Sequence, residues 1–284
     1  MQILHTTAEM RGLSREWREQ AERLCLVPTM GNLHAGHLRL VDRARALGSR
    51  IVASIFVNPM QFGPKEDFAA YPRTFEADCG LLREHDVHAV FAPDVSEIYP
   101  RPLDAMTRIE VPGVSEDLCG RSRPGHFTGV ATVVAKLFNI VQPQAAVFGE
   151  KDFQQLLVIR RMAADLALPV EIEGVATLRE TDGLAMSSRN AYLESEQRRQ
   201  APALYRTLGR VHSELTAGRR DYAALEEEAL RTLAAGGFEP EYVAVRRAGD
   251  LRAPAAEDAD LVILGAARLG RARLIDNIRW PGSD

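Results

Sequence analysis

Two histidines three residues apart, His34 and His37, are the side chains of this sequence that most directly suggest chemistry. They stand in the segment Pro-Thr-Met-Gly-Asn-Leu-His-Ala-Gly-His at residues 28–37, after a short apolar run and before a stretch with helical spacing. A helix start carries unpaired N–H groups and a partial positive charge, so it attracts phosphate. Gly31 and Gly36 would let the backbone approach a ligand closely. We therefore expect a strand-to-helix turn that binds the phosphates of a nucleotide.

Two other interpretations of the histidine pair stay open at this point. One histidine can cap the helix while the other lies in the core with its hydrogen bonds satisfied. A His-x-x-His pair can also bind a metal ion, but no third ligand stands nearby and the His-Glu-x-x-His pattern of zinc proteases is absent. The ten residues alone do not decide between phosphate binding and a structural role.

Two further segments carry polar side chains suited to small substrates. Asn58 and Gln61 are neutral amides, which hold hydroxyl or carboxylate groups without adding charge, although Asn58-Pro59 is also a turn signal. In Gly-Glu-Lys-Asp at residues 149–152, Lys151 follows a strand-like run, and Asp152 shares a helix face with Gln155.

A third segment, at residues 182–190, places Ser187, Ser188 and Arg189 next to one another. Two hydroxyls and a guanidinium on a glycine-containing loop suit a clamp that closes on phosphates, and an ordinary serine helix cap is the alternative. The Gly-x-Ser-x-Gly elbow of a serine nucleophile is absent.

Lysine is rare in this chain and occurs at Lys65, Lys136 and Lys151, while arginine supplies the other basic side chains. A retained lysine can mark a place that needs a compact point charge, and chance is the alternative.

The elements that must position these residues follow an alternating pattern. Strand-like runs at 24–27, 51–57, 89–92, 145–148 and 170–175 alternate with helical stretches at 38–47, 75–85 (Thr74 as N-cap), 128–141 and 153–166. This pattern predicts an α/β fold with a Rossmann-like, doubly wound parallel sheet, whose ligands bind beyond the carboxyl ends of the strands.

The pattern changes after residue 190. Two amphipathic stretches, at 196–215 and 222–233, precede strand-like runs at 241–245, 261–266 and 271–275, the last two joined across Leu269-Gly270 like a hairpin. We expect two domains, a Rossmann-like domain at residues 1–177 and a smaller α+β domain at residues 178–284.

Composition excludes several classes of function. The 284 residues are 46% hydrophobic and carry a formal net charge of −4, which argues against a long nucleic acid as partner. No window reaches the roughly 18 apolar residues of a membrane span. Three widely spaced cysteines, Cys25, Cys79 and Cys119, suit reduced thiols, so we expect a cytoplasmic protein.

Several segments in the same order give a specific resemblance. The chain resembles the pantothenate synthetase (pantoate–β-alanine ligase) family, which belongs to a nucleotidyl-transferring superfamily with a His-x-Gly-His signature, over essentially its whole length. The resemblance rests on residues 28–37, 56–62, 71–74, 123–127, 148–152, 183–190 and 273–277.

The resemblance implies ATP-dependent condensation of pantoate with β-alanine through a pantoyl adenylate, with Mg²⁺ and release of AMP and pyrophosphate. It implies a homodimer, a lid role for the C-terminal domain and a place in vitamin B5 and coenzyme A biosynthesis. A tRNA-charging or other nucleotidyl-transferring relative and a nucleotide sensor without turnover are the rival functions. The acidic net charge argues against tRNA as a substrate.

The resemblance also implies roles for individual residues. The catalytic residues would be His34, His37, Lys151 and Arg189. ATP would be bound by these four together with Met30, Gly149, Asp152, Met186, Ser187 and Ser188. Gln61 and Gln155 would hold pantoate, Asn58 and Arg123 would line the β-alanine and phosphate side, and Asp78 would be a magnesium ligand.

Overall fold

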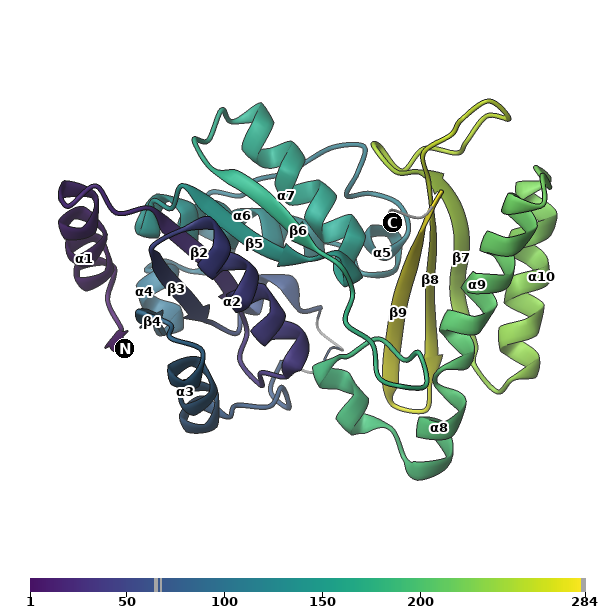
Figure 1. The fold of residues 1–284 in the computed structure, drawn as a ribbon, viewed down its shortest axis with the longest axis horizontal. Coiled ribbons are helices and arrows are strands. Elements are labelled where there is room, and N and C mark those ends of the chain that lie inside the picture. The colour runs from purple at the N-terminus through teal and green to yellow at the C-terminus, as the bar shows by residue number, and fades with distance from the viewer. Residues whose placement is uncertain (64–65, 67, 282–284) are drawn as a thin grey trace. The chain divides into compact units, whose positions relative to one another are not determined.

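The computed structural model describes residues 1–63, 66 and 68–281, and the chain divides into two compact units (Figure 1). The first unit is Met1–Glu150 with Gln155–Ala176, and the second unit is Lys151–Gln154 with Thr177–Asp284. Lys65 lies outside the described residues. The segment Lys151–Gln154 thus belongs with the C-terminal unit, although the sequence division at residue 177 leaves it with the N-terminal one.

The first unit is built on a six-stranded parallel sheet, which confirms the predicted fold class. The expected strands are present with ends shifted by no more than two residues. The short first strand was not predicted. The strand order is β1 (Gln2–Leu4), β4 (Ala89–Phe91), β3 (Arg50–Ile55), β2 (Leu24–Thr29), β5 (Ala145–Gly149) and β6 (Glu171–Val175).

Strand β2 runs two residues beyond its predicted end, through Pro28 to Thr29. Proline has no N–H to donate to a neighbouring strand, so it is unusual in a central strand. Here the ladder between β2 and β5 ends at Leu26, while the ladder to β3 continues to Thr29. Pro28 therefore lies where β2 pairs on one side only, close to the polar residues that follow the strand.

Helices connect the strands of the first unit. Their bounds are α1 (Thr7–Glu19), α2 (Ala35–Leu47), α3 (Phe75–Glu84), α4 (Val95–Ile98), α5 (Cys119–Ser122), α6 (His126–Val141) and α7 (Phe153–Asp165), with 3₁₀ turns η1 (Pro59–Gln61), η2 (Leu103–Ala105) and η3 (Glu150–Asp152). Helix α1 was not predicted. Its start carries a capping box, in which the Thr6 hydroxyl accepts from the Glu9 N–H and the Glu9 carboxylate accepts from the Thr6 N–H. That Thr-x-x-Glu pattern was visible in the sequence.

Alternate residues of the strands face opposite sides of the sheet. Cys25 and Val27 of β2 pack with Val41 and Ala44 of α2, which crosses one face of the sheet (Figure 1). Residues of the other parity, such as Phe148 of β5, face the opposite side, where Phe148 meets Phe138 of α6 with ring centroids 6.4 Å apart. Because helices cover both faces of the sheet, the ends of its strands remain open to ligands.

The second unit holds a three-stranded antiparallel sheet, β7 (Glu239–Arg247), β8 (Leu261–Leu269) and β9 (Ala272–Trp280), with the predicted hairpin between β8 and β9. Helices α9 (Ala203–Thr216) and α10 (Tyr222–Ala235) pack on this sheet (Figure 1). The single helix expected at 196–215 is wrong. The chain forms α8 (Ser195–Gln200) and α9 instead, because Pro202 cannot continue a helix.

Candidate active site

His34 stands at the start of α2 and caps it. Its Nδ1 accepts a hydrogen bond from the Gly36 N–H at 3.1 Å, and Nδ1 of His37 accepts from the His34 N–H at 3.3 Å. The two rings lie 4.1 Å apart between centroids. The helix-capping role that the sequence left open is therefore confirmed. It uses Nδ1 of each of the two rings.

The same hydrogen bonds determine what the histidines can offer a ligand. A neutral imidazole whose Nδ1 accepts a hydrogen bond carries its proton on Nε2. Each ring thus holds an Nε2–H donor at the positive end of a helix, which is the arrangement that suits phosphate oxygens. Capping and phosphate binding are compatible because they use different nitrogens.

Asp78 of α3 holds the turn that leads into the histidines. Its carboxylate is buried and accepts from the N–H groups of Asn32 at 2.9 Å and Leu33 at 2.8 Å, and from the Thr74 hydroxyl at 3.1 Å. Gly31 adopts a positive φ of 79°, and a Cβ there would lie 2.9 Å from Oδ2 of Asp78. The turn and the carboxylate are therefore fitted to each other.

Thr74 is the N-cap residue of α3, as expected. Thr74 precedes α3, but its side chain makes no capping hydrogen bond and donates to Asp78 instead. Among residues 1–63, 66 and 68–281, no group of three or more His, Cys, Asp or Glu side chains is placed to hold a metal ion.

Asn58 caps the turn η1 after β3, Gln61 is the last residue of this turn, and their side chains meet. Nδ2 of Asn58 donates to Oε1 of Gln61 at 3.2 Å and to the Gly129 carbonyl at 3.0 Å. Nε2 of Gln61 points to the sulfur of Met30 at 3.0 Å. The predicted amides and Met30, which follows β2, are thus neighbours at the carboxyl ends of adjacent strands.

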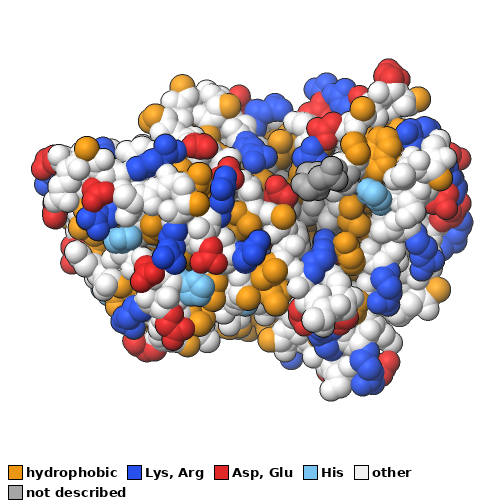
Figure 2. Space-filling view, in the orientation of Figure 1, with side chains coloured by type: hydrophobic (Ala, Val, Ile, Leu, Met, Phe, Trp, Pro, Cys, Tyr) orange, Lys and Arg blue, Asp and Glu red, His pale blue; other side chains and the backbone are white. Residues whose placement is uncertain are grey.

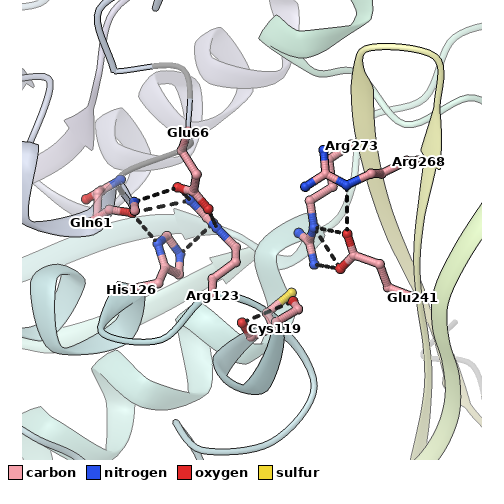
Figure 3. A network of polar contacts seen from close by, with 10 residues as sticks. Gln61, Glu66, Cys119, Arg123, His126, Glu241, Arg268 and Arg273 are labelled. Carbon is pink, nitrogen blue, oxygen red and sulfur yellow. Dashed lines mark hydrogen bonds and ion pairs between the residues drawn. The ribbon is translucent and has the colours of Figure 1, made fainter.

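The backbone carbonyl of Gln61 is held by two side chains, one from the end of α5 and one from the first residue of α6 (Figure 3). Nδ1 of His126 lies 2.8 Å from this oxygen, and Nη2 of Arg123 lies 3.3 Å from it. Arg123 also donates to both carboxylate oxygens of Glu66, at 2.6 and 2.7 Å, and its Nη1 lies 3.0 Å from Nε2 of His126. The sequence pointed to Arg123, and the contacts show that it fastens the Gln61 turn.

The ion pair with Arg123 changes the acidity of Glu66. Burial alone would raise the pKa of this carboxyl, but the hydrogen bonds and positive charge of Arg123 outweigh burial and lower the pKa to about 2. Glu66 is therefore ionised at neutral pH and keeps Arg123 in place.

In the second unit, Lys151 and Ser187 line one small hollow together with Asn190, Tyr205 and Asp276. The Lys151 backbone is fixed there because its carbonyl accepts from Nδ2 of Asn277 on β9 at 2.9 Å. This unit therefore brings together two segments that are distant in the sequence, at 149–152 and 182–190.

The serine and arginine segment forms the 3₁₀ turn η4 (Ser188–Tyr192). The Ser187 hydroxyl accepts from the Arg189 N–H at 3.3 Å and caps this turn, as the structural alternative expected. Met186, Ser187, Ser188 and Arg189 are all half-buried. A capped turn presents consecutive polar groups on a short, partly exposed loop.

An ion pair between Arg179 and the buried Asp276 supports this loop. Arg179 donates to both oxygens of Asp276, at 2.6 and 2.9 Å, and to the Gly183 carbonyl at 3.2 Å. Its guanidinium lies 3.6 Å from the centroid of the Tyr205 ring. The only sequence signal was the segment 273–277, which contributed to the resemblance but gave no role to Asp276.

Other features bear on what the site can do. The three cysteines are buried and form no disulfide, and burial raises the pKa of the Cys25 thiol to about 11, so it is not an activated nucleophile. Basic and acidic side chains are interspersed on the face shown in Figure 2. Within the described part of the chain, no helix has the length and apolarity needed to cross a bilayer.

The predicted residues thus form two sets. The first unit holds Met30, His34, His37, Asn58, Gln61, Asp78 and Arg123, and also Gly149 and the half-buried Gln155 at the start of α7. The second unit holds Lys151, Asp152, Met186, Ser187, Ser188 and Arg189.

Comparison with known proteins identifies relatives over the whole length. The sequence profile of the pantoate-β-alanine ligase family matches residues 2–279. A pantothenate synthetase from Methylococcus capsulatus is 56% identical over 278 residues, which cover 98% of this chain and 97% of the relative.

Solved structures of proteins with the same names are also similar to this chain. Pantothenate synthetase from Thermus thermophilus has a TM-score of 0.91 at 48% identity, covering 98% of this chain and 99% of that one. Pantoate-β-alanine ligase from Francisella tularensis, complexed with Beta-gamma ATP and Beta-alanine, has a TM-score of 0.84 at 31% identity, covering 100% and 99%. The chain therefore belongs to the pantoate-β-alanine ligase family.

Proposed function

We propose that this enzyme condenses pantoate with β-alanine at the expense of ATP, through an enzyme-bound pantoyl adenylate. The match to the ligase family over residues 2–279 carries this proposal, and the Francisella tularensis relative with its bound ATP analogue and β-alanine supports the choice of substrates. In the first step a pantoate carboxylate oxygen attacks the α-phosphorus of ATP, and pyrophosphate leaves. In the second step the β-alanine amine attacks the acyl carbon, the amide forms and AMP leaves.

Catalysis in this proposal comes from positioning and charge neutralisation. A carboxylate is a weak nucleophile and the α-phosphate is surrounded by negative charge, so fixed donors that meet the developing charge lower the barrier. We assign His34 and His37, through their Nε2–H groups, and Lys151 and Arg189, through their cations, to the phosphates. Ser187 and Ser188 add hydroxyl donors, and the reaction needs no covalent enzyme intermediate.

Neutral amides are assigned to pantoate. Gln61 presents its Nε2 away from Asn58, and Gln155 starts a helix after β5. Amide groups can bond a hydroxyl and a carboxylate without attracting polyphosphate. Asn58 is 1% exposed and Arg123 is engaged by Glu66, so we propose that these two act by fixing Gln61 rather than by contacting substrate.

The nucleotide's other contacts follow the family resemblance. We propose that Gly149 and Asp152 lie beside the ribose and that Met30 and Met186 border the nucleotide. We propose a homodimer, as the family resemblance implies. We also propose a reducing, cytoplasmic compartment, which three buried cysteines outside any disulfide favour.

The described residues build no site of their own that fits magnesium. Asp78 already receives three donors, and the described residues form no cluster of three metal-binding side chains. Mg²⁺ is usually bound through phosphates with few protein ligands, so we propose that it accompanies ATP on the phosphate oxygens.

Product analysis tests the proposed function. The purified chain is incubated with ATP and Mg²⁺, with pantoate and β-alanine added singly and together, and AMP and pantothenate are quantified. Equal amounts of both products that appear only with both substrates support the ligase. ATP binding without product in any mixture would favour the nucleotide sensor, and AMP transfer to an added tRNA would favour the tRNA-charging rival.

A further inference from the structure

Tyr99, which directly follows α4, is a buried residue whose hydroxyl points at the pantoate side of the site. It is 4% exposed, and its hydroxyl donates to Oδ1 of Asn58 at 2.8 Å. The ring is held on two sides, by Phe56 with centroids 6.2 Å apart and by the Lys136 ammonium 5.7 Å from the ring centroid. One of the rare lysines thus lies over the ring that carries this hydroxyl.

Asn58 links the Tyr99 hydroxyl to the residues around η1. Its Oδ1 also accepts from the Met60 N–H at 3.2 Å, while its Nδ2 donates to the Gly129 carbonyl and to Oε1 of Gln61. A backbone N–H can only donate and a backbone carbonyl can only accept, so the orientation of the Asn58 amide is determined. A Cβ at position 129 would lie 2.4 Å from the Met60 carbonyl oxygen, so glycine is needed there. At this point η1 and α6 meet backbone to backbone.

The orientation of Asn58 determines that of Gln61. Because Nδ2 of Asn58 donates to Oε1, the Gln61 amide must turn its Nε2 outward, toward the sulfur of Met30. Gln61 therefore offers a ligand hydrogen-bond donors and not its carbonyl oxygen. Its partner on a substrate must be an acceptor, such as a carboxylate or hydroxyl oxygen.

We propose that Tyr99 is a positioning residue that acts through Asn58 to hold Gln61 as a hydrogen-bond donor to an oxygen of pantoate. This inference rests on the proposed function, because it takes pantoate as the molecule that Gln61 binds. The hydroxyl of Tyr99 holds the buried end of the chain Tyr99–Asn58–Gln61. Its removal should loosen the presented amide without affecting His34, His37, Lys151 or Arg189, which are assigned to the phosphates of ATP.

The test compares Tyr99→Phe with the parent enzyme by steady-state titration of pantoate and of ATP. Phenylalanine keeps the ring contacts, and we expect a roughly five- to tenfold rise in KM for pantoate, which corresponds to the loss of one hydrogen bond, with KM for ATP unchanged. Tyr222→Phe removes a hydroxyl that donates to the Ala255 carbonyl in the second unit, and it should leave both constants unchanged.

A double-mutant cycle separates positioning from general destabilisation. In a Gln61→Ala background the effect of Tyr99→Phe on KM for pantoate should disappear, because the amide that Tyr99 positions is gone. An effect of the same size in that background would overturn the proposal, as would an unchanged KM for pantoate in Tyr99→Phe or an equal rise in KM for ATP.

Gln61→Glu tests the orientation independently of Tyr99. Glutamate keeps an oxygen facing Asn58 but replaces the outward donor with an oxygen, so KM for pantoate should rise at least as much as in Gln61→Ala. A parent-like KM for pantoate would overturn the assigned orientation. An inactive parent enzyme would instead refute the proposed function, which keeps the two failures distinct.

Discussion

The two units hold their polar residues in different ways. In the first unit, buried side chains reach the functional groups directly: Asp78, 2% exposed, binds the turn before the histidines, and Asn58, 1% exposed, binds the Gln61 amide. In the second unit, Arg179 pairs with the buried Asp276 and donates to the Gly183 carbonyl just before the serine and arginine segment, whose turn is capped locally by Ser187.

This difference predicts where substitutions of supporting residues matter. In the first unit, removing a support frees the functional group itself, so catalysis should suffer. In the second unit, the functional side chain should matter far more than the polar contacts near it.

The largest effect is expected at Lys151. Lys151→Ala should lower turnover roughly a hundredfold or more, because a cation that meets developing phosphate charge is typically worth about 3 kcal/mol. The free energy of unfolding should change little, since the Lys151 contact to Asn277 uses a backbone carbonyl. The measurements are steady-state turnover and chemical unfolding of the same preparation.

Arg199→Ala is the matched control, because it removes an exposed cation of the second unit that pairs with Glu196 on the surface. Its turnover should equal that of the parent enzyme. A Lys151→Ala enzyme with near-normal turnover would contradict the assignment of this lysine to the phosphates.

A smaller but substantial effect is expected at Asp78. Asp78→Asn replaces one acceptor with an N–H₂ group that faces a backbone N–H, and an unpaired buried donor costs about 1 to 3 kcal/mol. We expect kcat/KM for ATP to fall roughly tenfold or more as the histidine turn loosens. The Mg²⁺ concentration that gives half-maximal rate should stay unchanged, and a large rise in that concentration would instead make Asp78 a metal ligand.

Arg198 supplies the contrasting support residue in the second unit. It donates to Glu180 and Asp182 and is one-third exposed, at 32% of its side chain. Partly exposed ion pairs contribute about 1 kcal/mol or less, so Arg198→Ala should keep turnover within roughly threefold of the parent. A loss of activity in Arg198→Ala as large as that in Asp78→Asn would contradict the proposed difference between the support residues of the two units.

The smallest effect is one of stability and depends on pH. The folded-state pKa of Glu66, about 2, lies below its ordinary value of 4.5. Its pair with Arg123 therefore adds stability above pH 4.5 and loses it as the pH falls toward 2. Glu66→Gln should lower the free energy of unfolding by roughly 1 kcal/mol at pH 7.

Denaturant unfolding of both proteins between about pH 7 and pH 3 gives the check. The difference between parent and Glu66→Gln should shrink as the solution becomes more acidic. A difference that stays constant over this range would show that the ion pair does not lower the pKa of Glu66 as described.

Local patterns predicted most of the fold but little of the support around the site. The strands of the sheet and the histidine turn follow from apolar spacing and glycine positions, which act over a few residues. The bonds from Asp78 to Asn32 and from Tyr99 to Asn58 join residues 46 and 41 positions apart, and the pair Arg179–Asp276 spans 97. Spacing along one sequence carries no signal for such contacts, because the packing of strands and helices creates them.

Exchange of labelled pyrophosphate into ATP tests the central claim most directly. If the fixed donors assigned to phosphate support a reversible attack of pantoate on ATP, exchange must occur with pantoate and Mg²⁺ present and β-alanine absent. Lys151→Ala should lower this exchange rate roughly a hundredfold, as it lowers turnover. Exchange that appears only after β-alanine is added would contradict a pantoyl adenylate formed in a separate first step.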